Sequence, residues 1–430
     1  MIAMLKKQFE ISPTIFGIVV VKRLFYLFCI YVCIFSCSDK KEPEQYPVID
    51  VINNIGKYQK VYCSDLFSSM ELIPLETKGV CLVGGSSGIV INDKFILTIG
   101  SSFLDNPHIY AFNRVGEFKT EIAKKGQGPG EYLSSGNVFF NSEKPTVYIV
   151  DRLKCLEYDL DGNYIHSFHL PKFSTGTFDI ISNIGYIGNN LFIGNDRYNG
   201  NNKIKYCIFN QNGDTIKTFP SHIFFNRNGS MFMSKFDYAL NPINIDNRIY
   251  LKDYVNDTIY TLADLNLQPT YIFDFGKYSF SKEHLENTSI ENRTSNECVV
   301  TSLIGFPNYF FYNLTVPKSL SIPKSEFPQN NNIYGIYNIA ENKNILLDTD
   351  HLLYGIINDI NGGLPFIPLC YAGNNEVVGL WYPYIMKEKL TDEYFASQTI
   401  KDRQAHQKLK ELLKNLDEED NPVVVIAKLK

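Results

Sequence analysis

Three segments of this 430-residue chain repeat one pattern. Each has an aromatic residue at its fourth position and a glycine at its eighth. The segments are IYAFNRVGEFKTEI (109–122), CLEYDLDGNYIHSF (155–168) and YCIFNQNGDTIKTF (206–219). Weaker copies follow, with Tyr260 and then Tyr337 in the aromatic position. Apolar and polar residues alternate on both sides of an Asn, Asp or Gly turn, so each copy predicts a β-hairpin.

A further apolar run stands before several copies and adds strands to each repeat. These runs are VYIVD (147–151), LFIGND (191–196) and IYLKD (249–253). A unit of about 40–50 residues with four short strands is typical of a propeller blade. One blade cannot bury both of its faces, whereas a closed ring of blades can. The sequence therefore predicts an all-β chain, and its 14% of aromatic residues agrees with that class.

A family resemblance sharpens this prediction. The order of an apolar strand ending in Asp, an aromatic hairpin with Gly and a glycine-rich link resembles NHL repeats. The chain after its leader also resembles the six-bladed β-propeller lipoproteins of Bacteroidetes. The matching segments are SDLFSSMELIPLET (64–77), KKGQGPGEY (124–132), NDINGGLPFIP (358–368) and DEEDNPVVVIAKLK (417–430). The resemblance implies a six-bladed β-propeller of four-stranded blades, but it implies little chemistry because this fold hosts many functions.

The propeller domain is predicted to cover residues 47–430. Residues 281–331 show little periodicity and are expected to be an insertion in the fifth blade. Residues 386–416 are expected to form a small helical excursion, because leucines recur there at helical spacing among charged residues. The final strand VVVIAKL is expected to pair with strands near residues 48–51 and 70–75. The two ends of the chain would then close the ring and leave no open edge.

Residues 1–36 have the pattern of a lipoprotein-type signal peptide. Lys22 and Arg23 precede the apolar run LFYLFCIYVCIFS (24–36), which is short for a membrane span. The residues before Val21 are superfluous to such a signal, so Val21 is an alternative start of translation.

The signal ends in a segment that resembles a bacterial lipobox, which implies that Cys37 carries the lipid. Residues 37–46 then form a lipidated tether. Several acyl chains anchor a protein far better than one. We therefore expect a lipid-anchored protein of the cell envelope, at the outer membrane, facing either the periplasm or the surface.

The remaining cysteines and the net charge argue against two classes, a disulfide-stapled protein and a nucleic-acid-binding protein. The six cysteines after Cys37 are scattered singly, and a chain of this size needs no disulfide framework, so we expect buried free thiols. The net charge of −5 gives no reason to expect nucleic acid as a partner.

The stretch GQGPGEY (126–132) is the first candidate site. Glycines that cradle a phosphate need a helix directly after them, whereas this stretch is followed by a strand pattern. We interpret it as the link from the outer strand of one blade to the inner strand of the next. Such a link crosses one face of the disc, where its long side chains could contact a ligand. The candidates are Lys124, Lys125, Gln127, Glu131 and Tyr132.

A second candidate site follows the ends of three equivalent strands. Asp151, Asp196 and Asp253 end these strands, and each Asp is expected to cap the next turn through its side chain. In an alternative interpretation, the residues that come next project together from one rim. Those residues are Arg152, Arg197 and Tyr254, and such a rim would suit carbohydrate or an acidic peptide.

Two short motifs predict a covalent modification. Thr215 and Thr258 each stand between an Asp and an Ile, which resembles the acceptor used for O-glycosylation in Bacteroidetes. Both are expected at hairpins, where an attached glycan would meet solvent.

Three functional classes stay open. The leading one is a non-enzymatic binding or scaffold module, with carbohydrate or peptide as its ligand. The alternative is a metal-dependent enzyme of the sugar lactonase or lyase type, with a divalent cation on the propeller axis. The third is a structural partner of another envelope protein. The sequence supports no cofactor and shows no convincing catalytic cluster, which favours the first class.

Overall fold

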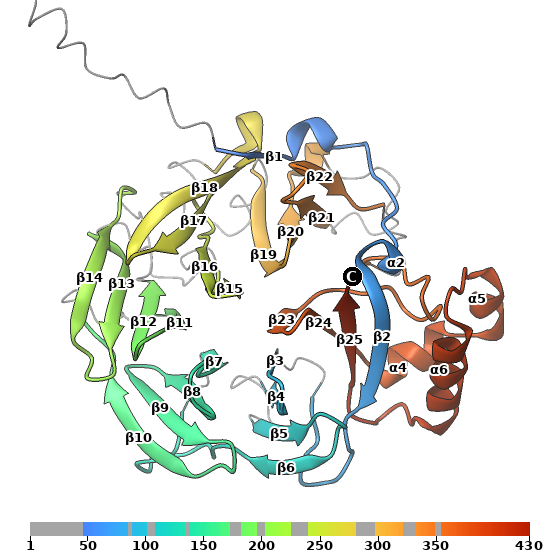
Figure 1. The fold of residues 1–430 in the computed structure, drawn as a ribbon, viewed down its shortest axis with the longest axis horizontal. Helices are drawn as coiled ribbons and strands as arrows, with labels where there is room; N and C mark the ends of the chain where they lie inside the picture. Colours follow the sequence, from blue (N-terminus) through green and yellow to red (C-terminus); the bar gives the residue numbers. More distant parts are fainter. Residues whose placement is uncertain are drawn as a thin grey trace, which may run out of the picture. The chain divides into compact units, whose positions relative to one another are not determined.

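The computed structural model describes residues 46–84, 88–100, 108–133, 137–172, 182–195, 203–224, 240–280, 297–320, 332–348 and 354–430. Pro47–Lys430 form one compact unit. Six β-sheets of this unit are arranged as blades around a common axis (Figure 1). The prediction of an all-β, six-bladed propeller is confirmed. None of the helices in the described residues combines the length and the apolar composition of a membrane span.

The first three blades follow one another along the chain. Blade one contains β3 (Gly88–Ile91), β4 (Phe95–Ile99), β5 (Ile109–Asn113) and β6 (Phe118–Glu121). Blade two contains β7 (Asn137–Phe140), β8 (Thr146–Asp151), β9 (Lys154–Asp159) and β10 (Tyr164–His169). Blade three contains β11 (Ser182–Gly188), β12 (Leu191–Asn195), β13 (Ile204–Asn210) and β14 (Thr215–Pro220).

Of the other three blades, blades four and six also include a strand from near the N-terminus. Blade four contains β15 (Ile243–Ile245), β16 (Arg248–Leu251), β17 (Thr258–Ala263), β18 (Asn266–Asp274) and a fifth strand, β1 (Val48–Asp50). Blade five contains β19 (Val299–Phe306), β20 (Tyr309–Thr315), β21 (Asn332–Asn338) and β22 (Lys343–Leu346). Blade six contains β23 (Cys370–Gly373), β24 (Glu376–Trp381), β25 (Val423–Leu429) and β2 (Phe67–Pro74).

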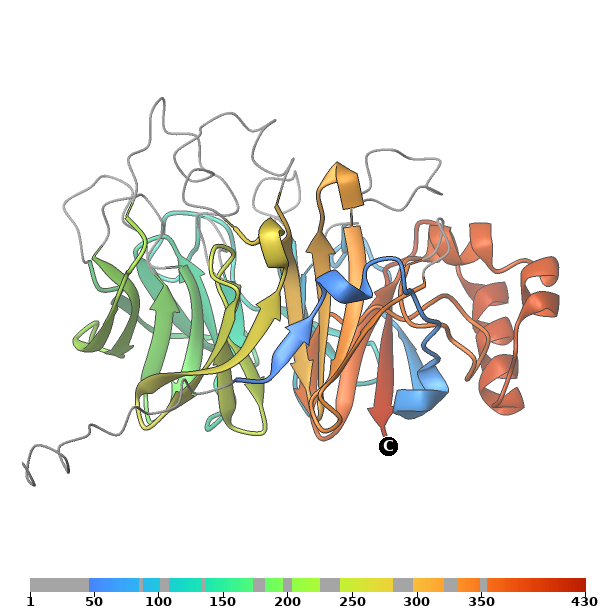
Figure 2. The same cartoon turned by 90° about the horizontal axis from the view of Figure 1, so that it is seen from above.

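Within each blade, the first strand lies nearest the axis and the last strand lies at the rim (Figure 1). Neighbouring strands run antiparallel, except that β1 joins β18 in parallel. The hairpins between first and second strands therefore meet around the axis on one face of the ring. The ends at which second strands lead to third strands, and fourth strands to the next blade, lie on the opposite face (Figure 2).

Blade six joins the two ends of the propeller. Strand β2 pairs with β25 in antiparallel register, from Phe67 opposite Leu429 to Pro74 opposite Val423. The predicted pairing of VVVIAKL with the segment near residues 70–75 is thus confirmed. Because this pairing makes β2 the outer strand of a sheet that begins with β23, the ring has no gap between its first and last blades.

The pairing expected for residues 48–51 was wrong. Strand β1 does not join the last blade; Val48 pairs with Ile272 and Asp50 with Asp274, at the outer edge of blade four. The chain then passes blade five, where Gln59 pairs with Leu347 in an isolated bridge. The segment from β1 to β2 therefore pairs with blades four, five and six in succession. A three-residue strand has too short a pattern to reveal its partner.

The expectation of an insertion over residues 281–331 also needs correction. Residues 299–315 contain β19 and β20, the first two strands of blade five, which pair from Val299–Thr315 to Phe306–Tyr309. The run VVTSLIGFPNYFFYNLT is almost continuously apolar because neighbouring blades cover both faces of these strands, so it lacks the alternation of a half-buried hairpin. Asn308, with φ of 67°, makes the turn between the strands. Residues 281–296 and 321–331 lie outside the described residues.

The repeated glycines hold neighbouring blades close together. Gly116, Gly162 and Gly213 have φ of 89°, 87° and 80°, as a tight turn requires. Each also lies against a carbonyl oxygen of the preceding blade, and a Cβ added to Gly162 would come within 2.9 Å of the Glu121 oxygen. At Gly116 the neighbour is the oxygen of Pro74, and at Gly213 it is that of His169. The glycine position of the repeat is therefore both a turn and a blade-to-blade contact.

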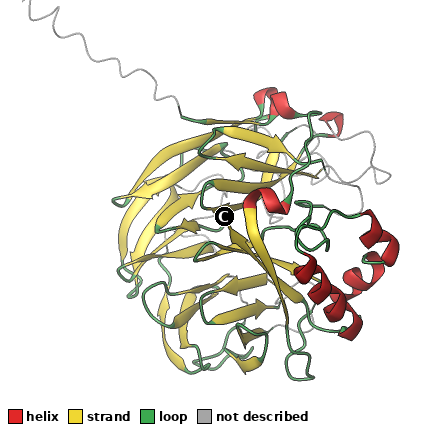
Figure 3. Ribbon diagram, turned by 45° about the vertical axis from the view of Figure 1, so that its right-hand side comes forward, coloured by secondary structure: helices red, strands yellow, loops and turns green. Residues whose placement is uncertain are grey.

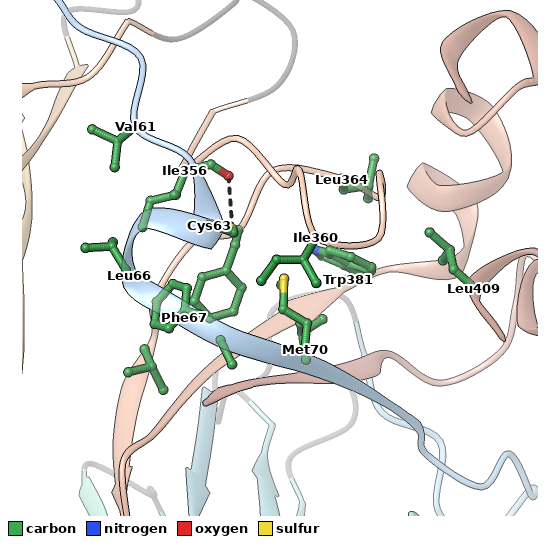
Figure 4. Packing of buried hydrophobic residues seen from close by; sticks show 14 of the residues in the cluster. Val61, Cys63, Leu66, Phe67, Met70, Ile356, Ile360, Leu364, Trp381 and Leu409 are labelled. Carbon is green, nitrogen blue, oxygen red and sulfur yellow. Dashed lines mark hydrogen bonds between the residues drawn. The ribbon is translucent and has the colours of Figure 1, made fainter. Parts of the chain in front are cut away.

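The predicted helical excursion is present beside blade six (Figures 1 and 3). Its helices are α4 (Pro383–Lys389), α5 (Asp392–Ser397) and α6 (Arg403–Asn415). The other helical turns in the described part of the chain are η1 (Ile52–Asn54), α2 (Cys63–Leu66), η3 (Gly276–Tyr278) and η5 (Lys318–Leu320). Figure 4 shows Leu409 of α6 facing the cluster that contains Trp381 and Met70. The excursion thus covers the outer face of the blade that closes the ring.

The cysteines agree with the expectation of free thiols. None of the six in the described residues forms a disulfide, and five are buried. Cys63 donates a weak hydrogen bond to the carbonyl oxygen of Ile356 at 3.8 Å (Figure 4). Burial raises the pKa of Cys63, Cys155 and Cys298, so these thiols act as small apolar groups rather than nucleophiles.

Candidate binding site

The stretch GQGPGEY joins β6 to β7, which confirms its interpretation as a link between blades. Backbone hydrogen bonds close it into a compact loop: Gly126 N donates to Tyr132 O at 3.0 Å, and Tyr132 N donates to Lys124 O at 3.1 Å. None of its three glycines is among the residues with positive φ. A Cβ on Gly126 would overlap the Glu131 carboxylate, which would have to move.

Two of the five candidates in this link have a structural role. The Glu131 carboxylate accepts a hydrogen bond from Gly128 N at 2.8 Å, and so holds the loop from inside. Tyr132 is fully buried in the core between blades one and two, which corrects the expectation that it faces a ligand. Its ring supplies the apolar anchor of the link, and burial raises the pKa of its hydroxyl. Lys124, Lys125 and Gln127 are exposed.

The second candidate site is only partly described, because Asp196 and Arg197 lie outside the described residues. Asp253 caps the next turn as predicted, accepting a hydrogen bond from Val255 N at 3.0 Å. Arg152 is exposed between β8 and β9, whereas Tyr254 is half-buried against the core. The structure thus does not bring Arg152 and Tyr254 together as an aligned pair of exposed side chains.

The predicted glycosylation sites differ in exposure. Thr215 is exposed where β14 begins, after the turn of Asn210–Asp214. Thr258 is half-buried at the start of β17, and its backbone N–H donates to Asn256 Oδ1 at 2.9 Å. Glycosylation of either residue stays a prediction. Cys37 lies outside the described residues, so its lipidation stays a prediction as well.

A cavity that sequence reasoning missed lies where the first hairpins of four blades meet near the axis. We call it the axial mouth; its volume is about 730 Å³. Its lining comes from the turns between β3 and β4, β7 and β8, β15 and β16, and β23 and β24. The exposed polar residues of this lining are Asp93, Lys94, Ser142, Glu143, Lys144, Asn244, Asp246, Asn247 and Asn374.

Turn chemistry explains why these hairpins are rich in Asn and Asp. Asp246 and Asn247 have φ of 48° and 67°, and Asn374 and Asn375 have φ of 51° and 62°. Two-residue hairpins of this kind need positive φ at both central residues, which Asn and Asp tolerate best. In blade one, Asn92 Oδ1 instead accepts from the backbone N–H groups two and three residues ahead, at 2.9 and 2.8 Å.

Side-chain contacts between blades make the axial mouth rigid. Glu143 of blade two accepts hydrogen bonds from the Tyr186 hydroxyl at 2.5 Å and from Asn189 N at 2.9 Å, both in blade three. The Tyr186 hydrogen bond is the main cause that lowers the pKa of Glu143, which therefore stays ionised. Tyr371 of blade six donates to Asp246 of blade four at 3.2 Å. A preformed rim of this kind costs little ordering entropy when a ligand binds.

The charges around the axial mouth nearly balance. Asp93, Glu143 and Asp246 face Lys94 and Lys144, with neutral amides between them. The lining can therefore donate and accept hydrogen bonds without a strong field of one sign. In the described residues, no group of three or more His, Cys, Asp or Glu side chains is placed to hold a metal ion.

Comparison with known proteins places the chain in a family. A profile of the family described as Domain of unknown function (DUF4934) matches residues 46–428. The chain belongs to this family. A comparison with curated protein sequences finds no match.

Three solved structures are similar to this DUF4934 protein, and the first of them shares its fold. A "Putative exported protein" from Bacteroides fragilis has 18% identity and a TM-score of 0.66, with 90% of this chain and 100% of that chain covered. A member of the duf4221 family from Bacteroides vulgatus has 9% identity and a TM-score of 0.49, with 85% and 97% covered. Virginiamycin B lyase from Staphylococcus aureus has 12% identity and a TM-score of 0.35, with 66% and 75% covered.

A sequence signal for the axial mouth exists in this DUF4934 protein. The turn pairs Asn92-Asp93, Asp246-Asn247 and Asn374-Asn375 each stand between the first two strands of a blade. Once the repeat fixes the order of strands, all such turns must fall on the same face near the axis. The aromatic hairpins of the repeat are formed by the third and fourth strands, so their pattern does not mark these inner turns.

Proposed function

We propose that this DUF4934 protein is an exported, lipid-anchored binding module that holds a carbohydrate at the axial mouth. The observation that carries the proposal is the convergence of exposed amide, carboxylate and ammonium groups from four blades on a cavity of about 730 Å³. Cavities of roughly 300–1,000 Å³ are typical of small-molecule sites. Loops of a rigid scaffold are also where binding residues usually stand.

The chemistry of the lining favours carbohydrate over peptide. Sugar hydroxyls donate and accept at once, which matches the mixture of amides and nearly balanced charges at the axial mouth. Tyr371 and Phe140 are half-buried in the lining, so part of each ring remains accessible to the apolar face of a sugar.

Glycine substitutions in the turns test the site without disturbing the fold. Asn247→Gly and Asn374→Gly remove an amide side chain, yet glycine keeps the positive φ of 67° and 51°. Each should weaken carbohydrate binding about 3- to 10-fold, as expected for the loss of one hydrogen bond. Binding is first located on a glycan array and then measured by calorimetry on the purified protein.

A matched control uses the same turn in a blade outside the cavity. Asn308→Gly in blade five changes an exposed residue with φ of 67° that does not line the axial mouth, so affinity should stay unchanged. Equal effects in all three variants would contradict the assignment of the site. Binding of peptides but no glycan would support the peptide alternative, and binding of neither would favour a structural role beside another envelope protein.

The lipid anchor rests on the sequence near Cys37 and on the export of a similar protein. The Bacteroides fragilis structure of 18% identity is that of a "Putative exported protein", which supports export of this chain. Labelled palmitate should be incorporated into the full chain, and Cys37→Ala should abolish the label. Cys33→Ala, a matched change in the leader, should retain it. Undiminished labelling of Cys37→Ala would disprove the anchor.

A further inference from the structure

A single arginine joins two of the turns that form the axial mouth. Arg114 stands in the hairpin between β5 and β6 of blade one and does not itself line the cavity. Its guanidinium donates a hydrogen bond from Nη1 to the backbone oxygen of Asn92 at 3.0 Å. Its Nη2 atom lies 2.6 Å from Oε2 of Glu376 in blade six. One side chain therefore contacts the inner turns of the first and the last blade of the ring.

Both contacts are made directly beside residues that line the cavity. Asn92 belongs to the lining itself, and so do Asp93 and Lys94, which follow it in the sequence. Glu376 is the first residue of β24, two residues after the lining residue Asn374. The positions of these lining residues thus depend on where the two turns are held.

The chemistry of arginine suits this role. Its guanidinium is planar and always charged, so the directions of its two hydrogen bonds are fixed relative to each other. The side chains of Arg114 and Glu376 are 22% and 19% exposed, so solvent and salt screen this pair less than an ion pair on the open surface. Lys428 of β25 adds a second cation 3.6 Å from Oε1 of Glu376. The Glu376 carboxylate is therefore held by two cations.

The inner turn of blade one is otherwise closed by its own atoms. Asn92 N donates to Phe95 O at 3.0 Å, and Asn92 Oδ1 accepts from the backbone N–H groups of Lys94 and Phe95. These bonds fix the shape of the turn, but they do not fix its place relative to blade six. The contacts of Arg114 with Asn92 and Glu376 supply that second restraint.

We propose that Arg114 is a positioning residue of the axial mouth, which sets the spacing between the inner turns of blades one and six and thereby the affinity for carbohydrate. This role rests on the carbohydrate site proposed above and adds a residue outside the cavity lining. A preformed rim costs little ordering entropy when a ligand binds. Release of the two turns therefore weakens binding although every lining residue is still present.

Hydrogen exchange, followed by mass spectrometry on the full-length protein, tests the two turns without any ligand. In Arg114→Gln, the amides of residues 92–95 and 373–376 should exchange about tenfold faster, because loss of a charge-assisted hydrogen bond favours opening of the turns. Residues 245–248 form the corresponding turn of blade four and should exchange at the wild-type rate. A general loss of stability would instead accelerate exchange in blade four as well.

Affinity is measured by calorimetry with the glycan that binds most tightly on the array. Arg114→Gln should weaken its binding about 3- to 10-fold, and Glu376→Gln, which removes the other half of the ion pair, should have a similar effect. Arg248→Gln is the matched control for the loss of one positive charge. The Arg248 guanidinium donates to the hydroxyl of Tyr250 in its own strand, so affinity should stay unchanged in that variant.

Two double variants show whether Arg114 acts through the turn of blade six. Arg114→Gln combined with Asn374→Gly should weaken binding less than the product of the two single effects, because both changes act on one turn. Arg114→Gln combined with Asn247→Gly should give the full product, because Asn247 stands between β15 and β16 of blade four. A role of Arg114 in stability alone would give the full product in both cases.

Three outcomes would overturn the inference. They are wild-type exchange in both turns of Arg114→Gln, equal losses of affinity in Arg114→Gln and Arg248→Gln, and the full product in both double variants. If Arg114→Gln does not fold, Glu376→Gln decides by the same measurements. If the wild-type protein binds no glycan, the proposed function fails, whereas the exchange rates still decide whether Arg114 holds the two turns together.

Discussion

Val425→Lys should lower the free energy of unfolding by about 3–5 kcal/mol, the usual cost of an uncompensated buried charge. Val425 is fully buried in the middle of β25, opposite Leu72 of β2 and Gly379 of β24. A lysine there would place an ammonium group in the apolar cluster on one face of blade six, the blade that closes the ring. Urea unfolding followed by tyrosine fluorescence gives the midpoint and its shift.

A control on the same strand tests whether burial of Val425, and not merely its place in β25, causes the loss of stability. Lys428 lies three residues further along β25, with a side chain that is 48% exposed and 3.6 Å from Glu376 Oε1. Lys428→Gln should cost less than about 1 kcal/mol, because exposed ion pairs contribute little. If both variants unfold at the same denaturant concentration, blade six is not the element that holds the ring closed.

Gly213→Ala should destabilise the protein by about 2–5 kcal/mol for two separate reasons. The residue has φ of 80°, which costs an L-amino acid about 1–2 kcal/mol. In addition, its Cβ would overlap the backbone oxygen of His169 in blade two, and overpacking of this kind costs about 1–3 kcal/mol. Since the neighbour is backbone rather than a flexible side chain, the blades themselves must separate.

Gly373 offers a control in which only the first reason applies. It has the same φ of 80°, but a Cβ there would meet nothing within 4 Å. Gly373→Ala should therefore cost only about 1–2 kcal/mol in the same urea experiment. Equal losses in the two alanine variants would mean that the repeated glycine serves the turn alone and does not set the spacing between blades.

Sequence periodicity could predict the blades because each blade is a local unit. The aromatic and glycine positions lie within one hairpin, so a single segment such as residues 155–168 contains the whole signal. Strand β1 and the pair β19–β20 escaped prediction for opposite reasons. The first is too short to have a period, and the second is covered on both faces, so that its apolar run does not alternate.

The candidate site was harder to predict because it is assembled from distant parts of the chain. Asp93 and Asn374 line the same cavity although most of the propeller separates them in sequence. In the link between blades one and two, Glu131 was expected to contact a ligand, yet its carboxylate accepts a backbone hydrogen bond inside its own loop. Residue type and polarity alone do not distinguish a side chain that binds a ligand from one that supports a turn.

The pairing of β2 with β25 also means that blade six is completed late in folding. Phe67 pairs with Leu429, so the outer edge of blade six can form only after nearly all of the chain has been synthesised. Contacts between such distant segments form slowly, because the chain loses the entropy of loop closure before the pairing contributes any favourable free energy. Until then, β2 presents Phe67, Met70 and Ile73 beside an unpaired strand edge. A β2 strand from another copy would satisfy the same pairs, so a dimer with exchanged β2 strands is the side product to which this architecture is prone at high concentration.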